Sequence, residues 1–213
     1  MERNSLAPVM GIDRLRMGTD GNGITSLVTF YGCPLKCKYC LNPQCHRDIS
    51  TIKLSRPDDV YEIVAIDELY YLATEGGVTF GGGEPLLYSD FIVNILELGA
   101  KKWNVTIETS LNVPFERIKV LLPYINEMIV DVKEINPQIY ELYTQSSNKV
   151  VLENLKLLSN CGYSDKVTVR IPLIKGYNTQ DDNQESRHLL ENLGYSCFDL
   201  FEYKTEFRYD GKR

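Results

Sequence analysis

The chain has 213 residues, of which 43% are hydrophobic and 24% charged, so it is long enough for one domain with a sizeable core. Its formal net charge of -6 argues against a general nucleic-acid surface. No apolar stretch approaches the roughly 20 residues that cross a bilayer, and residues 1–10 lack the apolar segment of a signal peptide. We therefore expect a cytoplasmic protein without membrane contact, with one domain over residues 1–213.

Short apolar runs alternate with helical patterns along the chain. The apolar runs predict strands at residues 26–30, 78–80, 105–108, 128–131, 167–172 and 198–201. Between them we expect helices at residues 57–74, 88–101, 114–122, 137–143, 150–161 and 179–193. This alternation is typical of an α/β protein with a parallel sheet. Six strand–helix units suit an open, partial (β/α)6 barrel.

Three cysteines, Cys33, Cys37 and Cys40, follow the first predicted strand in the pattern Cys-x-x-x-Cys-x-x-Cys. A structural zinc ion takes four protein ligands, and a 4Fe–4S cluster that only transfers electrons takes four cysteines. Three thiolates would leave one iron of such a cluster open for a substrate. Because three of the six cysteines lie within eight positions, the pattern favours metal binding in a reducing compartment over a disulfide framework.

At this motif the chain resembles the radical S-adenosylmethionine (SAM) enzymes, and within them most of all the activating enzymes of glycyl radical enzymes, such as pyruvate formate-lyase activating enzyme. Residues 18–24 and 31–33 also follow that family's lead-in to the cysteines. The resemblance implies a partial barrel of the radical SAM type with one 4Fe–4S cluster, whose open iron binds SAM. It also implies cleavage of SAM to a 5′-deoxyadenosyl radical that abstracts hydrogen, and an electron donor of the flavodoxin or ferredoxin type.

Polar residues follow most of the predicted strands. Barrel enzymes place their chemistry at the carboxyl ends of the strands, so we expect these residues to converge on one mouth. They are Gly81-Gly82-Gly83-Glu84, Glu108-Thr109-Ser110, Asp131-Val132-Lys133, Arg170 with Lys175 after it, and Glu202-Tyr203-Lys204.

The segment Gly82-Gly83-Glu84-Pro85 is open to two interpretations. A run of glycines between a strand and a helix is often only a turn. It is a poor phosphate loop, because the Lys-Ser/Thr ending is missing and Glu84 would repel phosphate. In the family that the chain resembles, the matching segment lies at the methionine end of SAM. The resemblance implies that backbone groups of Gly82 and Gly83 and the carboxylate of Glu84 receive the SAM ammonium group.

The carboxylates of Glu108 and Asp131 are a second candidate set. At strand ends such groups also cap helices or face solvent. In the activating enzymes the matching Asp-Thr and Asp-x-Lys segments, with a backbone carbonyl, hold a monovalent cation beside SAM. The resemblance therefore implies cation ligands at Glu108, Thr109, Asp131 and the carbonyl of Ile129, and a SAM contact at Lys133. Glu108 replaces the usual aspartate, which changes the reach of the carboxylate.

Three further positions are candidate cofactor contacts. Arg170 alternates with apolar residues, so its guanidinium faces away from them and is a carboxylate or phosphate partner; a strand-edge salt bridge is the alternative. Tyr39 matches an aromatic position near the adenine in this family, although it could simply cover the cysteine loop. Lys204 aligns with a histidine that is common at the mouth of the family's last strand.

The remaining cysteines divide into two groups. Cys45, followed by His46, raises the alternative of a zinc site in which one of them completes the three-cysteine set. Cys45 is also the spare thiol expected near the mouth, so it is a candidate hydrogen donor. Cys161 and Cys197 fall at a predicted helix end and a predicted strand start, on the opposite rim, where we expect them in the core.

The leading hypothesis is an activase that removes a glycine α-hydrogen from a partner enzyme and acts as a monomer, with Lys133, Arg170 and Cys45 as candidate catalytic residues. Three alternatives remain open: modification of a ribosomally made peptide by epimerisation or cross-linking, radical chemistry on a small molecule, and a zinc-stabilised binding module. The departures from the family pattern at Thr25, Glu108 and Lys204 leave the substrate undefined.

Overall fold

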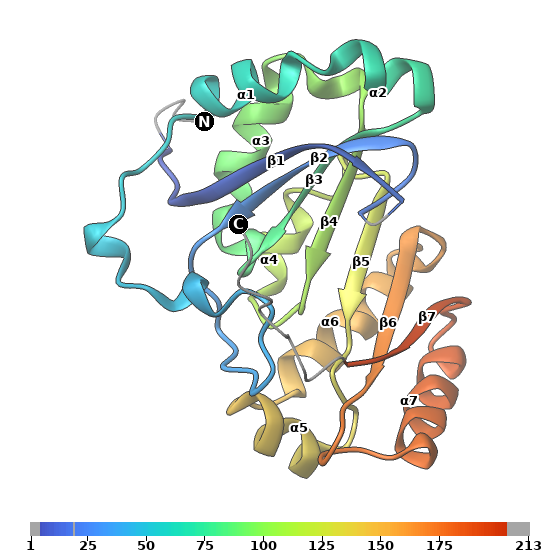
Figure 1. Cartoon of the computed structure of the whole chain (residues 1–213). Coiled ribbons are helices and arrows are strands. Elements are labelled where there is room, and N and C mark those ends of the chain that lie inside the picture. Colours follow the sequence, from blue (N-terminus) through green and yellow to red (C-terminus); the bar gives the residue numbers. More distant parts are fainter. Residues whose placement is uncertain (1–4, 19, 204–213) are drawn as a thin grey trace, which may run out of the picture.

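A seven-stranded sheet forms the centre of the molecule (Figure 1). The computed structural model describes residues 5–18 and 20–203. The strands follow one another in chain order across the sheet, and β1 pairs antiparallel with β2 while all later pairs are parallel. Their bounds are β1 Val9–Met17, β2 Ile24–Phe30, β3 Gly77–Gly82, β4 Asn104–Thr109, β5 Glu127–Asp131, β6 Val167–Leu173 and β7 Cys197–Glu202.

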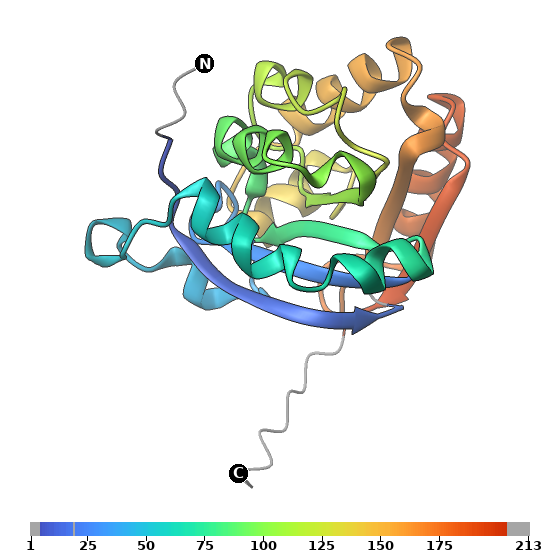
Figure 2. The ribbon, with the colours of Figure 1, turned by 90° about the horizontal axis from the view of Figure 1, so that it is seen from above.

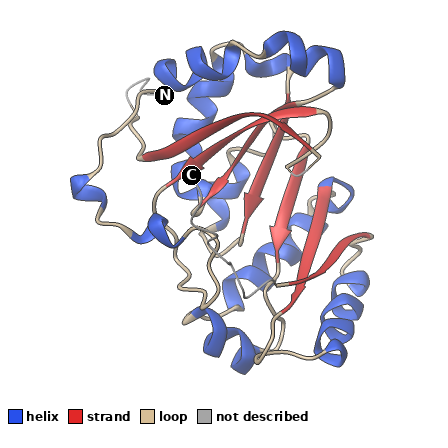
Figure 3. Cartoon of the chain, in the orientation of Figure 1, coloured by secondary structure: helices blue, strands red, loops and turns tan. Residues whose placement is uncertain are grey.

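Helices surround the sheet and connect its parallel strands (Figure 3). The α-helices are α1 Pro57–Ala65, α2 Glu68–Thr74, α3 Ser89–Glu97, α4 Phe115–Lys119, α5 Pro137–Thr144, α6 Lys149–Asn160 and α7 Gln180–Asn192. Short 3-10 helices are η1 Pro43–His46, η2 Ile49–Thr51, η3 Pro85–Tyr88, η4 Ala100–Lys102 and η5 Ser164–Lys166. Among the described residues, no helix is long and apolar enough to cross a membrane.

The open α/β barrel expected from the sequence is confirmed, because six parallel strands alternate with helices and the order of the sheet is linear. Figure 2 shows the bend of this sheet: β1 and β2 run along one side of the view, and β6 and β7 along another. Each of the six predicted strands lies within an observed one. The carboxyl ends of β2 to β7 therefore point to one edge, as a parallel sheet requires.

The sequence prediction missed the first strand. β1 contains Gly11 and three charged side chains, and most of its residues are exposed or half-buried. Its pairing with β2 is interrupted by two irregularities, one between Val9 and Gly11 and one between Asp13 and Arg16. Because an exposed edge strand needs no apolar alternation on its outer side, its sequence carries little of the period-two signal.

The predicted helix at residues 57–74 is divided into α1 and α2. Asp67 lies at the break and is almost fully buried. Its two carboxylate oxygens accept hydrogen bonds from Arg14 of β1, from Nε at 2.6 Å and from Nη2 at 2.7 Å. This bidentate pair with β1 bends the chain where periodicity alone predicts a continuous helix.

Apolar side chains on one face of the sheet pack against the helices and form the core. Val28 and Phe30 of β2, Phe80 of β3 and Ile107 of β4 have no exposed surface, and Ile92 of α3 packs in the same cluster. Burying side chains of this size contributes about 1.5–3 kcal/mol each. The strands are thereby held rigidly, which fixes the directions in which their ends point.

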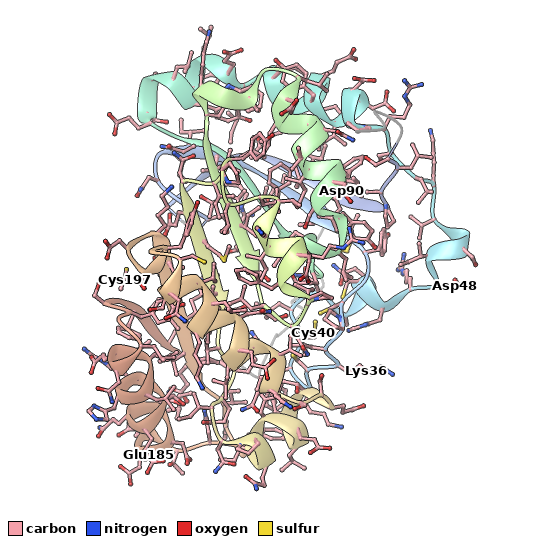
Figure 4. All side chains as sticks on the ribbon, turned by 180° about the vertical axis from the view of Figure 1, so that it is seen from behind. Lys36, Cys40, Asp48, Asp90, Glu185 and Cys197 are labelled. Carbon is pink, nitrogen blue, oxygen red and sulfur yellow. The ribbon has the colours of Figure 1, made fainter. Side chains whose placement is uncertain are left out.

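Cys161 and Cys197 were predicted to be core residues, and this is wrong, because both are exposed. Their predicted places hold: Cys161 follows the end of α6, and Cys197 begins β7. β7 is an edge strand whose residues are mostly exposed, so a position at its start is not covered. Figure 4 shows Cys197 at the outer edge of the molecule, away from Cys40.

Candidate functional site

A cavity of about 160 Å³ lies at the edge of the sheet where the parallel strands end. The lining comes from residues 31–42, which carry the three cysteines and are called the cysteine loop, and from the ends of β3 to β6. This is the convergence expected from the sequence. Its walls include the predicted site residues Cys33, Cys37, Cys40, Gly82, Gly83, Glu108, Thr109, Asp131, Lys133 and Arg170. Ten candidates from five elements thus share one site. A larger cavity of about 370 Å³ lies between α7 and β7, and its walls contain no cysteine.

The cysteine loop follows β2 and is held at two points. The buried side chain of Leu35 anchors it in the core. The backbone N–H groups of Lys36 and Lys38 donate to the carbonyls of Thr144 and Tyr143 at 2.8 and 3.1 Å, at the end of α5. These bonds satisfy carbonyls that the last turn of a helix leaves without partners. The loop is thus tied to the far half of the sheet.

The three thiols of the loop are partly buried beside one another. Burial raises the pKa of the Cys33 thiol to about 12. Burial also raises the pKa of Cys37, while the nearby ammonium of Lys133 lowers it. Thiols in such a setting become thiolates when a metal supplies the compensating positive charge. The loop therefore fits a metal-centred group better than a free nucleophile.

The glycines of the predicted SAM segment are required by close packing against this loop. A Cβ on Gly83 would lie 2.2 Å from the carbonyl oxygen of Gly32, and one on Gly82 would lie 2.6 Å from Cβ of Thr29. Gly82 also has a φ of 92°, which favours glycine. Its carbonyl accepts from Nδ2 of Asn42 at 3.2 Å. The glycine segment and the cysteine loop therefore form one continuous wall.

The carboxylate of Glu84 turns away from the cavity towards the end of β4. Oε1 accepts from Oγ1 of Thr109 at 2.7 Å and from the N–H of Leu86 at 3.2 Å. Oε2 accepts from the N–H and the hydroxyl of Ser110, at 3.0 and 2.7 Å. Burial raises the pKa of Glu84, and the bonds from Ser110 and Thr109 oppose that shift. Both carboxylate oxygens of Glu84 therefore have donors within the chain, and its contact with SAM stays a prediction.

Glu108 and Arg170 form an ion pair in the cavity wall. Arg170 Nη1 lies 2.8 Å from Oε1 of Glu108, and its Nε lies 3.2 Å from Oδ2 of Asp199 on β7. Burial by itself lowers the pKa of Arg170, but Glu108 and Asp131 raise it above its ordinary value. The prediction that Arg170 faces away from its buried apolar neighbours is confirmed. Asp199 was missed, although it stands in register with Arg170 on the adjacent strand.

Asp131 and Lys133 form a second ion pair. Lys133 Nζ lies 3.0 Å from Oδ2 of Asp131 and donates to the hydroxyl of Tyr203 at 3.3 Å. Burial lowers the pKa of Lys133, but Asp131 and Tyr203 more than offset this, so the pKa is raised. The ammonium group is therefore charged, although the side chain is almost fully buried. The cavity wall thus carries two fixed cations and two fixed carboxylates.

The side chains predicted to bind a monovalent cation already have partners within the protein. Glu108 is paired with Arg170, and Asp131 with Lys133. The hydroxyl of Thr109 donates to Glu84 and accepts from the N–H of Leu111 at 2.9 Å. A metal cation at these carboxylates would lie beside the guanidinium of Arg170 and the ammonium of Lys133, and both would repel it. This donor set does not fit the expected monovalent cation.

Besides Glu84, three candidates lie outside the cavity walls or the described residues. Tyr39 packs on Tyr143 and Tyr177, with ring centroids 6.1 and 5.8 Å apart, and does not line the cavity. Cys45 is buried close to Cys40 and is not part of the cavity wall. Lys204 lies outside the described residues.

Comparison with known proteins agrees with this arrangement. The model of the radical SAM superfamily matches residues 27–185. The chain is 33% identical over 165 residues to the (2S)-3-sulfopropanediol dehydratase activating enzyme of Klebsiella oxytoca, covering 74% of this chain and 51% of that protein. It is 30% identical over 208 residues to the pyruvate formate-lyase-activating enzyme of Streptococcus mutans, covering 89% of this chain and 76% of that protein.

The coverage of these relatives is uneven. The chain spans about half the length of the Klebsiella protein and of the indoleacetate decarboxylase activating enzyme of Tractidigestivibacter scatoligenes, at 51% and 49%. Among solved structures, SuiB of Streptococcus suis bound to S-adenosylmethionine is similar with a TM-score of 0.61 and 17% identity, over 86% of this chain and 39% of that one. This likeness concerns the fold. Together, the family match and the cysteine loop at the mouth of an open barrel show that the chain belongs to the radical SAM superfamily, among the relatives of the glycyl radical enzyme activating enzymes.

Proposed function

We propose that this chain activates a glycyl radical enzyme by removing a hydrogen atom from one of its glycines. The observation that carries the proposal is the single cavity in which the three cysteines of the loop meet the glycine segment and the charged strand ends. The 30% identity with a pyruvate formate-lyase-activating enzyme, over most of both chains, supports the choice of substrate class.

The residues of the cavity fit the two cofactors that the superfamily implies. Cys33, Cys37 and Cys40 would hold a 4Fe–4S cluster, and its open iron would bind SAM. When bound, these groups supply the reductive cleavage of SAM that yields a 5′-deoxyadenosyl radical. The electron would come from a flavodoxin or a ferredoxin. The monovalent cation is left out of the proposal, because its expected ligands are paired with Arg170 and Lys133.

The chain's own groups would bind and orient SAM. The ammonium of Lys133 and the guanidinium of Arg170 are suited to the SAM carboxylate, because both are charged and partly shielded from water. The glycine segment brings backbone groups to the cavity, where no side chain stands in the way. Glu84 would act indirectly, by fixing Thr109 and Ser110 at the end of β4.

The open side of the barrel supports a polypeptide as the substrate. Within the described residues the sheet does not close on itself, so β1 and β7 remain at its two edges. A loop of a partner enzyme could enter there and cover the cavity, which would exclude water from the radical. We propose that the chain meets this partner as a monomer.

Modification of a peptide is the weaker candidate. Its epimerisation form needs a hydrogen donor opposite SAM, and Cys45 was the candidate. Cys45 is buried and is not among the residues that line the cavity. This position does not offer Cys45 to a substrate.

Anaerobic reconstitution and product analysis test the proposal. The loaded protein should bind about four irons per chain. With a reductant and SAM it should release 5′-deoxyadenosine, and the glycyl radical enzyme encoded nearest to it in the genome should then show an organic radical signal. Cys37→Ala should abolish both results, whereas Cys197→Ala, which changes an exposed thiol on the opposite rim, should leave them unchanged. A loaded wild-type protein that releases no 5′-deoxyadenosine would refute the proposal.

A further inference from the structure

A second set of metal-ligating side chains shares Cys40 with the cysteine loop. Cys40, Cys45 and His46 have ligand atoms that all lie within 4.8 Å of one another, and within residues 5–18 and 20–203 this is the one such group of three. The set of Cys33, Cys37 and Cys40 does not meet this limit. Cys40 belongs to both sets.

The spacing of the two sets fits two different occupants. A tetrahedral zinc ion with Zn–S bonds of about 2.3 Å and Zn–N bonds of about 2.0 Å brings its ligand atoms to within about 4 Å of one another. The Cys40–Cys45–His46 set approaches this spacing. Ligands on three different irons of a cluster stand further apart, and the Sγ atoms of Cys33, Cys37 and Cys40 do not all lie within 4.8 Å of one another.

The backbone holds Cys45 firmly in place. Its carbonyl accepts from the N–H of Gly32 at 2.7 Å, and its N–H donates to the carbonyl of Asn42 at 2.9 Å. Cys45 is 1% exposed, and its Sγ atom lies within 4.8 Å of the Sγ atom of Cys40. His46 follows in the same 3-10 helix and is exposed, so an ion can reach the set from solvent. The set is therefore preorganised on one side and accessible on the other.

We propose that the cluster-free protein binds one zinc ion through the Sγ atoms of Cys40 and Cys45 and a ring nitrogen of His46, with water as the fourth ligand. Two thiolates and an imidazole are ligands that zinc prefers. Binding releases the two thiol protons to solvent. Because the one Sγ atom of Cys40 would have to bridge both occupants, we expect this ion and the 4Fe–4S cluster to exclude each other. This second statement rests on the proposed function.

Titration of the anaerobic, cluster-free protein with Co²⁺ tests the site. We expect one Co²⁺ per chain, with the absorption of a tetrahedral ion bound to thiolates, and displacement by one equivalent of Zn²⁺. Cys45→Ser and His46→Gln should each weaken binding by at least about tenfold, since even second-shell changes at metal sites cost about 10–100-fold. His46→Gln changes an exposed side chain, so the result does not depend on the folding of a core variant.

Cys33→Ser is the matched control, because Cys33 belongs only to the cluster set. It should bind Co²⁺ as the wild type does. If Cys33→Ser lowers the affinity as much as Cys45→Ser, or if Cys45→Ser and His46→Gln bind like the wild type, the proposed site is wrong.

The exclusion of the two occupants has its own measurement. One equivalent of Zn²⁺, added before iron and sulfide, should slow cluster assembly in the wild type and have little effect in His46→Gln. Equal rates with and without zinc in the wild type would refute the exclusion. If no variant and no wild-type sample assembles a cluster, the proposed function fails, while the Co²⁺ titration still decides the zinc site.

Discussion

Replacement of Arg170 by methionine should destabilise the protein, and the loss should grow with pH. At 2.8 Å the attraction between Arg170 and Glu108 is about 6 kcal/mol at an effective dielectric constant of about 20. Desolvation of the two groups offsets much of it. The two side chains are 22% and 20% exposed, so the pair is only partly buried. We therefore expect the free energy of unfolding to fall by about 2–3 kcal/mol, which is at or below the low end of what breaking a fully buried ion pair costs.

The pH dependence follows from the pKa of Glu108. Burial already raises this pKa in the folded wild type, and Arg170 opposes the shift. Without Arg170 the folded pKa rises further, so the folded state of the variant holds its proton to higher pH than the unfolded chain does. A carboxyl group with a raised folded pKa costs stability as the pH rises from its unfolded pKa through its folded one. The deficit of Arg170→Met should therefore be larger at pH 8 than at pH 5.

Urea unfolding of the cluster-free protein at both pH values measures this effect. A loss of about 2–3 kcal/mol corresponds to a fall in Tm of about 4–12 °C for a chain of this size. The double variant Glu108→Gln with Arg170→Met removes both charges and should recover most of the loss at pH 8. A deficit that is equal at the two pH values, or a double variant no more stable than Arg170→Met, would show that the ion pair does not act as we infer.

Three further predictions concern the cavity. Gly83→Ala would place a Cβ 2.2 Å from a backbone oxygen of the cysteine loop. It should lower the free energy of unfolding by about 1–3 kcal/mol, measured by thermal unfolding, and reduce the iron bound on reconstitution. Gly11→Ala, where the nearest contact is at an ordinary distance, should do neither. The Lys133→Met variant should still bind iron, but equilibrium dialysis should show that it binds SAM at least about tenfold more weakly. This corresponds to a loss of about 1.4 kcal/mol in binding free energy. An unchanged SAM affinity would show that Lys133 does not contact SAM. Replacing potassium by Tris at constant ionic strength should change the SAM affinity of the wild type by less than about twofold. The reason is that Arg170 and Lys133 already neutralise the carboxylates of Glu108 and Asp131. A tenfold higher affinity in potassium would contradict this.

The parallel strands and the place of the site could be predicted from the sequence because both depend on local patterns. Short apolar runs mark β2 to β7, and the polar residues directly after them must meet at one edge of a parallel sheet. The contact between Arg14 and Asp67, which divides the first helix, joins residues 53 positions apart. No local pattern contains such a contact, and the same holds for the pairing of β1.

The directions of individual side chains were the least predictable part of the site. The motif places Glu84 next to the cavity, but its carboxylate points towards four hydrogen-bond donors of Leu86, Thr109 and Ser110. A buried carboxylate goes where its hydrogen bonds can be satisfied, and that depends on the neighbouring strand. The exposure of Cys197 likewise depends on β7 being an edge strand, which composition does not reveal.

The hydrogen bonds from the cysteine loop to the end of α5 have a mechanical consequence. The loop begins at the end of β2, while α5 follows β5, so Lys36 and Lys38 join two parts of the barrel that are separated by β3 and β4. The loop therefore spans the carboxyl-end opening of the barrel and connects its two sides. Any motion that widens the barrel to admit a partner would pull on the segment that carries the three cysteines. Access of the proposed substrate and the spacing of the three cysteines would therefore be coupled through two backbone hydrogen bonds.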